Sequence, residues 1–471
     1  ELMNINISLY LFANKKDATT ITNAMLNSTL LKLNKIPIVL TLASVLLYIA
    51  FAYDLVRTDY IKLITLYTAL FFLFYKLVQI NKNNFKFLAY AAFVLRAVFI
   101  LAIPNLSQDF YRFIWDGRMI LEGFNPYLFT PESFLIQSEL PILEAEELYA
   151  GMGPLNGSHF SNYPPLNQLC FVIAGVFAGK SILGSAIVLR LIIIAADFGT
   201  LYFGKRLLEK LKIPAYNIFW YILNPFIIIE LTGNVHFEGV MIFFLMWSLY
   251  LLHINKWKQA AVIMACSVSI KLIPLIFLPL LFQKLDWKKS ILFYGIVGST
   301  TLLLFLPFYT PEFLNNYAQT VGLWFQNFEF NASIYYLARE VGYWFRGYNE
   351  IATIGKIIPI IVILFVLFMA FFRKNKTTIQ LITNMLLVLS FYYFTTTTVH
   401  PWYISTLLIL SIFTNYKYPL VWSFAIILSY LAYLQIDQAV KSENLWIIAI
   451  EYIIVFSVFL HELLKRKNIE N

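Results

Sequence analysis

The sequence contains little charge and almost no cysteine. Lys, Arg, Asp and Glu make up only 13% of its 471 residues, whereas 60% are hydrophobic. Ordinary soluble domains carry about twice that share of charge, so a soluble fold is excluded and a polytopic membrane protein is predicted. Apolar runs of this length must be helices, because lipid offers no partner for an unpaired backbone group. The alternating segments of a membrane barrel are absent. The predicted fold class is therefore all-α.

The two cysteines, Cys170 and Cys266, both lie inside apolar runs, which argues against a disulfide framework and a cysteine metal site. The net charge of +9 comes from Lys and Arg residues in short loops rather than from one basic stripe. No nucleic-acid partner is therefore predicted. The positive-inside rule accounts for these residues. No cleavable signal pattern is seen, so the first apolar run is expected to act as its own insertion signal.

One transmembrane domain is predicted over residues 36–465, between a cytoplasmic segment, 1–35, and a cytoplasmic tail, 466–471. No convincing internal repeat or low-complexity linker divides it. About 11 to 13 transmembrane helices are expected. The clearer apolar runs lie at residues 36–53, 62–80, 86–104, 184–203, 214–232, 237–254, 290–308, 352–372, 378–396, 402–415, 418–434 and 445–463.

Two further segments leave this count open. Residues 166–180 follow Pro164-Pro165 and offer only about fourteen apolar residues, short of the roughly twenty that a straight span needs. Residues 259–283 are interrupted by Lys271 and Pro274 and have lysines at both ends. They form either two half-length helices meeting at Lys271 or one kinked span. The two doubts are coupled, because each changes the side on which the later loops lie.

Two long loops are predicted to lie outside the membrane. Residues 105–165 follow three spans and contain eight acidic residues against two arginines, the reverse of the cytoplasmic loops. Residues 309–350 form a second loop. Because aromatic side chains prefer the headgroup level, this loop is expected to lie along the outer interface. Its characteristic side chains are Trp324, Phe325, Tyr335, Tyr336, Arg339 and Trp344.

The stretch at residues 107–127 concentrates acids, bases and aromatics in an otherwise apolar chain. Ser107 can cap a helix that starts directly after it. Asp109, Arg112 and Asp116 then fall at i, i+3 and i+7, on one face of that helix. The helix is expected to end near Gly123, before a turn at residues 125–127. This face is a candidate active site, and its simpler interpretation is a solvated, salt-bridged surface.

Three more polar clusters reach the same membrane face under this topology. An ammonium inside an apolar run is costly, so Lys271 suggests function, unless its side chain extends to the interface. The other two clusters could equally be a polar turn and a helix cap. Together the clusters supply a carboxylate base and cations, as sugar transfer from a lipid phosphate requires. The members of these two other clusters are Asn234, His236 and Glu238, and His400, Trp402 and Tyr403.

The order of motifs resembles the GT-C superfamily of integral-membrane glycosyltransferases. The resemblance is greatest to mannosyltransferases related to the first GPI mannosyltransferase and to bacterial polyprenol-phosphate-sugar enzymes. It covers residues 100–285 well and the rest loosely. The motifs are DFYRFIWDGRMILEGFNPY, NYPPL, NPFIIIELTGNVHFEGVMIFFLMWSLYLL, SIKLIPLIFLPLL and HPWY.

This resemblance implies an inverting transferase that moves a hexose, expected to be mannose, from a polyprenyl-phosphate donor to a lipid-linked, glycan or protein acceptor. Asp109 would be the general base and Lys271 would contact the donor phosphate. The active site would face the periplasm of a bacterial inner membrane, among membrane lipids. The remaining residues expected to bind substrate are Arg112, Asp116, Arg118, Asn125, Tyr127, Tyr163, Asn234, His236, Glu238, His400, Trp402 and Tyr403.

The chain departs from the family pattern in two places. Related eukaryotic enzymes often have a DxD motif in the first loop, whereas Asp109 here stands alone and Asp116 follows later. No cofactor is therefore certain, and a divalent metal, Mg or Mn, is left open. The first two spans are also expected to be an N-terminal addition relative to the family core.

Two rival functions come from other classes. A secondary transporter or lipid flippase would place ionisable residues near the membrane midplane and often shows inverted repeats. The concentration of polar residues in exterior loops, and the lack of a visible repeat, argue against transport. An assembly protein would use the acidic loop only as a docking surface.

Overall fold

The computed structural model describes residues 35–136, 140–326, 328–435 and 443–470. Within these ranges the chain is helical and forms no strand beyond one isolated bridge, Phe330 with Thr398. The predicted N-terminal segment, except for Lys35, and residue 471 of the predicted tail lie outside the described residues. The all-α prediction is confirmed.

Seven helices in the described residues are long and apolar enough to cross a membrane. An eighth is possible if Pro225–Gly233 and Glu238–His253, which are bent by 114°, count as one span. The chain is therefore an integral membrane protein of the polytopic class. The seven are α3 (Lys35–Tyr53), α4 (Tyr60–Ile80), α10 (Ile182–Lys210), the continuous run of η3 and α15 (Ile273–Phe308), α18 (Ile351–Phe372), α19 (Thr378–Thr395) and α22 (Leu445–Glu470).

This number is lower than the 11 to 13 expected, because several apolar runs form short helices. An apolar run shows that a segment can be buried, but it does not show how long its helix is. The helices α5, α9 and α14 end after 13, 14 and 14 residues. Helices of that length need neighbours to complete the passage through a bilayer. The short helices are α5 (Phe85–Ala97), α9 (Pro165–Ala178), α14 (Trp257–Ile270), α20 (Ile404–Ser411) and α21 (Tyr418–Ala425).

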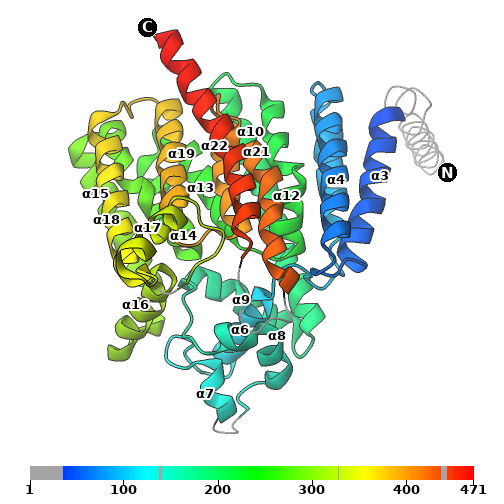
Figure 1. The fold of residues 1–471 in the computed structure, drawn as a ribbon, viewed down its shortest axis with the longest axis vertical. Helices are drawn as coiled ribbons and strands as arrows, with labels where there is room; N and C mark the ends of the chain where they lie inside the picture. Colours follow the sequence, from blue (N-terminus) through cyan, green and yellow to red (C-terminus); the bar gives the residue numbers. More distant parts are fainter. Residues whose placement is uncertain (1–34, 137–139, 327, 436–442, 471) are drawn as a thin grey trace, which may run out of the picture.

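One end of the bundle, the upper end in Figure 1, gathers connections that are rich in lysine. Lys82 after α4 lies 5.6 Å from the ring of Tyr216, and Lys205 near the end of α10 lies 5.0 Å from the ring of Phe85. At the same end, His253 Nδ1 of the α13–α14 turn is 2.9 Å from the hydroxyl oxygen of Thr378. We call this the lysine-rich end.

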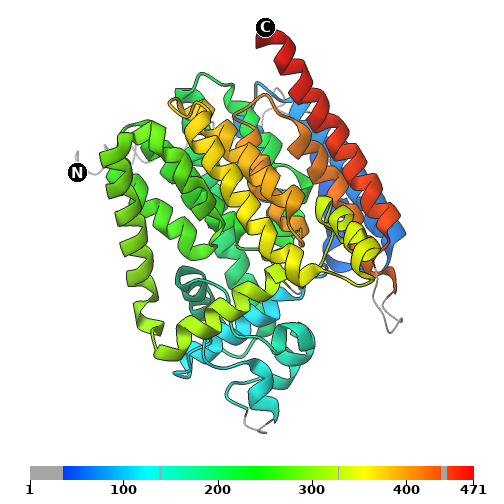
Figure 2. The same cartoon turned by 60° about the vertical axis from the view of Figure 1, so that its left-hand side comes forward.

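The opposite end carries a cap of short helices below the bundle (Figure 1). The cap consists of α6 (Asp109–Leu121), α7 (Pro131–Ile136), α8 (Ala145–Gly157) and α9. Figure 2 shows α16 (Pro311–Gln326) crossing the bundle beside this cap. We call this the cap end.

The segment 259–283 enters the bundle from the lysine-rich end and returns to it. α14 ends at Ile270, Lys271 follows at the tip, and η3 (Ile273–Leu281) leads back. Gln283 Nε2 then donates to the carbonyl oxygen of Arg373 at 2.8 Å, in the α18–α19 turn of the lysine-rich end. The continuous helical run breaks at Asp286, before the main part of α15. The structure therefore selects the two half-length helices over the kinked span.

The short segment α9 likewise stays at the cap end. Near its start, Gln168 Nε2 donates to Asp116 of α6 at 3.1 Å. Just after its end, the carbonyl oxygen of Lys180 accepts from Arg118 of α6 at 2.7 Å. Since both ends of α9 contact the same cap helix, α10 alone makes the crossing that follows.

The second loop, residues 309–350, contains α16 and α17 (Ile334–Arg346). Trp344 is 85% exposed, as an aromatic at the interface would be, whereas Tyr335 and Tyr336 are buried. Arg339 pairs with Glu329 at 2.5 Å, so its charge stabilises the loop itself. The side chains of Trp324 and Phe325 lie outside the described part of the structure.

Candidate active site

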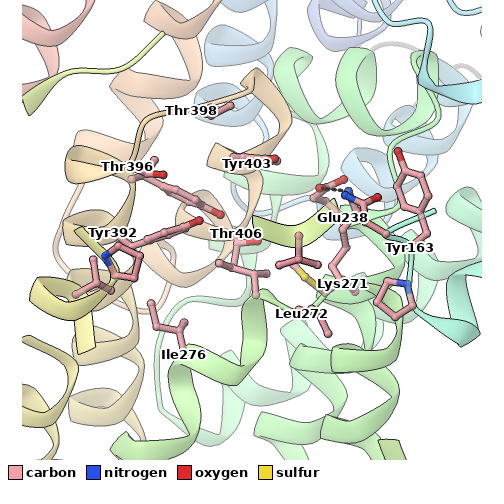
Figure 3. Close-up of a pocket in the computed structure, with 18 of the residues that line it drawn as sticks. Tyr163, Glu238, Lys271, Leu272, Ile276, Tyr392, Thr396, Thr398, Tyr403 and Thr406 are labelled. Carbon is pink, nitrogen blue, oxygen red and sulfur yellow. Dashed lines mark ion pairs between the residues drawn. The ribbon is translucent and has the colours of Figure 1, made fainter. Parts of the chain in front are cut away.

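A cavity of about 410 Å³ lies where the bundle meets the cap. Lys271 stands at one side of it and forms an ion pair with Glu238, Nζ to Oε1 at 2.8 Å (Figure 3). The same ammonium lies 5.6 Å from the ring centre of Tyr163. Tyr403 also lines the cavity. The structure thus brings together four of the predicted site residues, from four separate segments of the chain.

The remaining wall of the cavity is largely aliphatic. It is contributed by α13 (Glu238–His253), η3, α16, α18, α19 and α20. A cation and a carboxylate therefore border a space that could hold a hydrocarbon chain. The aliphatic lining residues are Met241, Leu272, Ile273, Ile276, Val321, Val362 and Ile363.

Asp109 is the first residue of α6 and is half-buried. Its backbone N–H donates to the hydroxyl of Ser107 at 3.3 Å, but the N-cap position is Gln108, one residue later than the predicted cap. The pKa of the Asp109 carboxyl is raised from 3.8 to about 6, chiefly by burial. The positive charge of Lys271 lowers this pKa and the negative charge of Glu238 raises it. A hydrogen bond from the side chain of Asn156 also lowers it. Asp109 is thus electrostatically coupled to the cavity, although it is not among the lining residues.

A carboxyl group with a pKa of about 6 is ionised at neutral pH and still basic enough to accept a proton. This is how burial prepares an acid for general-base work. Asn156, which the sequence analysis missed, lies 47 residues beyond Asp109 in sequence. No local pattern links the two residues, because only the fold of the cap brings them together.

Arg112 and Asp116 form a closed network inside the cap rather than a solvated helix face. Their side chains pair at 2.8 Å, with 5% and 0% exposure. Arg112 Nη1 also donates to the carbonyl oxygens of Asn156 and His159, at 2.6 and 2.8 Å. Asp116 accepts from Ser161 at 2.6 Å. These contacts hold residues 156–161 against α6. Arg112 Nη2 is left without a hydrogen-bond partner in the described structure, and the substrate contacts of this pair stay a prediction.

Polar atoms of three further predicted residues form hydrogen bonds that hold the cap together: those of Arg118, Asn125 and Tyr127. Arg118 pairs with Glu144 and donates to the carbonyl oxygen of Leu143 at 2.8 Å. The amide of Asn125 donates to the carbonyl oxygen of Phe308 at 2.9 Å, at the end of η4 (Leu306–Phe308), which follows α15.

Tyr127 is buried, and its hydroxyl donates to the carbonyl oxygen of Tyr163 at 2.5 Å. Tyr127 therefore supports the backbone of a cavity residue from behind. Arg118, Asn125 and Tyr127 do not line the cavity.

A stack of three aromatic rings lies behind Lys271. Trp402 stands between His236, with ring centres 3.7 Å apart, and His400, with ring centres 4.6 Å apart. Burial and the charge of Lys271 lower the pKa of His400 to about 3. The contact of His400 with the donor phosphate stays a prediction. The stack joins the segment after η2 (Ile228–Gly233) to the start of α20.

The turn that carries Asn234 and His236 is fixed by a buried arginine. Arg190 donates to the carbonyl oxygens of Thr232 at 2.8 Å and Gly233 at 2.9 Å. Asn234 Oδ1 then accepts from the backbone N–H of Leu106 at 3.0 Å, three residues before Asp109. Asn234 therefore ties the bundle to the chain that leads into α6.

Glu230 is a further buried acid that sequence reasoning missed. Both of its carboxylate oxygens accept from the hydroxyl of Tyr430 at 2.9 Å, and His236 Nε2 is 4.0 Å away. Its position inside the apolar run 214–232 could have identified Glu230 from the sequence, because a carboxylate is costly there.

Several polar atoms near the cavity are buried without a hydrogen-bond partner in the described structure. They include Glu238 Oε2, Thr406 Oγ1 and both ring nitrogens of His236. Buried polar atoms are nearly always paired, so unpaired ones beside a cavity mark a place for a ligand or for water. Among the described residues, no three or more His, Cys, Asp or Glu side chains are grouped so as to hold a metal ion. A divalent metal stays a prediction of the resemblance alone.

The fold and the site define a class: an all-α polytopic membrane protein with a lysine–glutamate pair in a largely apolar cavity and a half-buried aspartate on a cap helix that is coupled to this pair. The model of the family "Alpha-(1->6)-mannopyranosyltransferase, N-terminal domain" matches residues 23–285, and the chain belongs to this family. This agrees with the resemblance to the GT-C superfamily. The narrower likeness to the first GPI mannosyltransferase stays a prediction.

Two curated relatives bear the name alpha-(1->6)-mannopyranosyltransferase A. The protein from Mycobacterium tuberculosis is 22% identical over 186 residues, which is 39% of this chain and 34% of the relative. The protein from Corynebacterium glutamicum is 28% identical over 189 residues, which is 38% of this chain and 35% of the relative. The match therefore spans about a third of each relative's length. No solved structure matches.

The family match also corrects one expectation. It begins at residue 23 and so includes α3 and α4. These two helices belong to the family's own domain and are no addition to it. Asp109, Glu238 and Lys271 lie inside the matched residues, whereas His400, Trp402 and Tyr403 lie beyond them.

Proposed function

We propose that this protein transfers a mannosyl group from a polyprenyl-phosphate donor to a hydroxyl group of a glycan acceptor, with inversion at the anomeric carbon. The observation that carries the proposal is the cavity in which the ammonium of Lys271 borders an aliphatic wall. A lipid phosphate combines the same two chemistries, an anion joined to a hydrocarbon chain. The family membership supports mannose as the sugar.

The donor would lie with its isoprenoid chain along Leu272, Ile276 and Val362. Its phosphate would contact Lys271, because a lysine ammonium is a common partner of phosphate oxygens. The hydroxyl groups of Tyr403 and Thr396, which also line the cavity, would face the sugar.

The chemical step is a single displacement. The acceptor oxygen attacks the anomeric carbon and passes its proton to the carboxylate of Asp109. The bond between the anomeric carbon and the phosphate oxygen breaks, and the polyprenyl phosphate leaves with an added negative charge that Lys271 stabilises. One carboxylate is sufficient, because no covalent sugar–enzyme intermediate forms. No step is assigned to a metal.

We further propose that the cap end faces the exterior, which is the periplasm if the membrane is a bacterial inner membrane. Two charge distributions support this orientation. Lys82 and Lys205 lie at the opposite end, as the positive-inside rule expects of cytoplasmic loops. The cap segment, residues 105–165, contains eight acidic residues against two arginines.

The test is transfer by the purified protein in detergent, with radiolabelled mannosyl polyprenyl phosphate and octyl α-mannoside as probe acceptor. We expect label in a disaccharide product and none with Asp109→Asn. Glu122→Gln is the matched control, because Glu122 is an exposed acid at the end of the same helix. Undiminished transfer by Asp109→Asn would refute the assignment. Movement of labelled donor across a bilayer without any product would favour a flippase instead.

A further inference from the structure

A second cavity, also of about 410 Å³, lies at the cap end. It is formed between the turn that joins α3 to α4 and the chain that leads into α6. It shares no lining residue with the cavity that contains Lys271. Its polar lining residues are Arg57, Thr58, Asn105, Ser107, Gln108 and Tyr111.

This cavity adjoins Asp109 along the chain. Ser107 and Gln108 directly precede the aspartate, and Tyr111 follows it by two residues. Lys271 and Glu238, by contrast, act on Asp109 from the first cavity. Asp109 is therefore a direct chain neighbour of residues that line the second cavity and is coupled electrostatically to two residues that line the first.

The wall of the second cavity is held by bonds between α3 and the segment before α6. Asn105 Nδ2 donates to the carbonyl oxygens of Phe51 at 2.8 Å and Leu55 at 3.1 Å. Arg57 Nη1 donates to the carbonyl oxygen of Leu106 at 3.3 Å. A wall fixed in this way needs little reordering when a ligand enters.

The chemistry of the lining suits a neutral, hydroxyl-rich ligand. Amide, hydroxyl and phenol groups both donate and accept hydrogen bonds, as sugar hydroxyls do, and the guanidinium of Arg57 adds further donors. No carboxylate is among the lining residues of this cavity. The half-buried ring of Tyr111 adds an apolar face of the kind on which a sugar ring can rest.

We propose that the second cavity binds the acceptor glycan, with the α3–α4 turn as its outer wall. This inference rests on the proposed function. An inverting displacement requires the acceptor oxygen and the departing phosphate on opposite sides of the sugar. One cavity coupled to Asp109 through Lys271, and a separate cavity lined by chain neighbours of Asp109, match the two substrates. It also gives α3 and α4 a role beyond crossing the membrane.

The test is to fill the cavity from its exposed rim. Thr58 is exposed in the α3–α4 turn, so Thr58→Trp adds an indole at the cavity with little risk to folding. We expect the KM for octyl α-mannoside to rise at least about tenfold, while the Kd for a fluorescent polyprenyl phosphate stays within about twofold. Val56→Trp, at a second exposed lining residue, should act in the same way.

One control separates filling of the cavity from other effects. Tyr60→Trp places an indole at the exposed first residue of α4, which does not line the cavity, and should leave both constants unchanged. An unchanged acceptor KM in folded Thr58→Trp and Val56→Trp would overturn the inference, as would a loss of donor affinity. Failure of the wild-type protein to transfer mannose to any acceptor would instead overturn the proposed function.

Discussion

Replacing Asp109 with asparagine should remove activity and at the same time stabilise the protein above pH 6. The folded structure raises the pKa of this carboxyl from 3.8 to about 6, chiefly by burial. Such a rise corresponds to roughly 3 kcal/mol of unfavourable free energy for the ionised form. Because Asp109 is only half-buried, solvent reduces this cost, and we expect ~1 to 3 kcal/mol.

The sign of the pH dependence follows from the two pKa values. Below 3.8 the carboxyl is protonated in the folded and unfolded states, so aspartate and asparagine should give equal stability. Between 3.8 and about 6 the wild-type protein progressively loses stability relative to Asp109→Asn, and above about 6 the full difference is present. Transfer should fall by roughly 10²- to 10⁴-fold, the usual contribution of a general base.

The assay is thermal unfolding in detergent at pH 5 and pH 8, with mannosyl transfer measured on the same samples. Asp116→Asn on the same helix is the matched contrast, because Asp116 is fully buried and paired with Arg112. Breaking a buried pair costs ~3 to 5 kcal/mol, so this variant should lose stability. If Asp109→Asn unfolds at a lower temperature than the wild type at pH 8, or keeps its turnover, the reasoning about this site is wrong.

Three further changes test the cavity and the cap. Lys271→Met should weaken donor binding by roughly ten- to a hundredfold, because one charge-assisted hydrogen bond is lost. It should also raise the pH at which kcat/KM falls on the acid side. An unaltered donor Kd would show that Lys271 does not contact the donor. Glu238→Gln should move that acid limb to lower pH, because the charge of Glu238 raises the pKa of the aspartate at the start of α6; a shift upward would contradict this. Gly117→Ala should lower the thermal unfolding temperature by destabilising the protein ~1 to 3 kcal/mol, since a Cβ there would lie 2.3 Å from the carbonyl oxygen of Phe171. Gly295→Ala, with open space around it, should not.

The helical membrane fold and the position of the candidate base could be predicted locally. Apolar runs reveal which segments lipid can surround, and a serine two residues before Asp109 reveals where a helix starts. An ammonium in an apolar run drew attention to Lys271 without any knowledge of its partner. The ion pair with Glu238 joins residues 33 positions apart, and that pairing follows only from the antiparallel packing of α13 and α14.

Residue spacing along a helix shows which side chains share a face, but tertiary packing decides which part of that face is covered. Asp109, Arg112 and Asp116 share a face at i, i+3 and i+7, but residues 156–161 fold over the later part of it. Arg112 and Asp116 therefore close on each other, while Asp109, one turn earlier, couples electrostatically to the cavity. No pattern within α6 distinguishes the catalytic candidate from the structural pair.

The sequence by itself determined that this chain is an all-helical membrane protein, with a lone acid at a helix start and a lysine placed where lipid would not tolerate it. Those properties depend on hydropathy and on neighbours within a few residues. Only the tertiary structure decided that α14 and η3 turn back at Lys271, that one cavity forms around the Lys271–Glu238 pair, and that the α3–α4 turn lines a second cavity with the chain that leads into α6. Distances between segments depend on how helices pack, and packing is set by contacts between residues that are far apart in the chain.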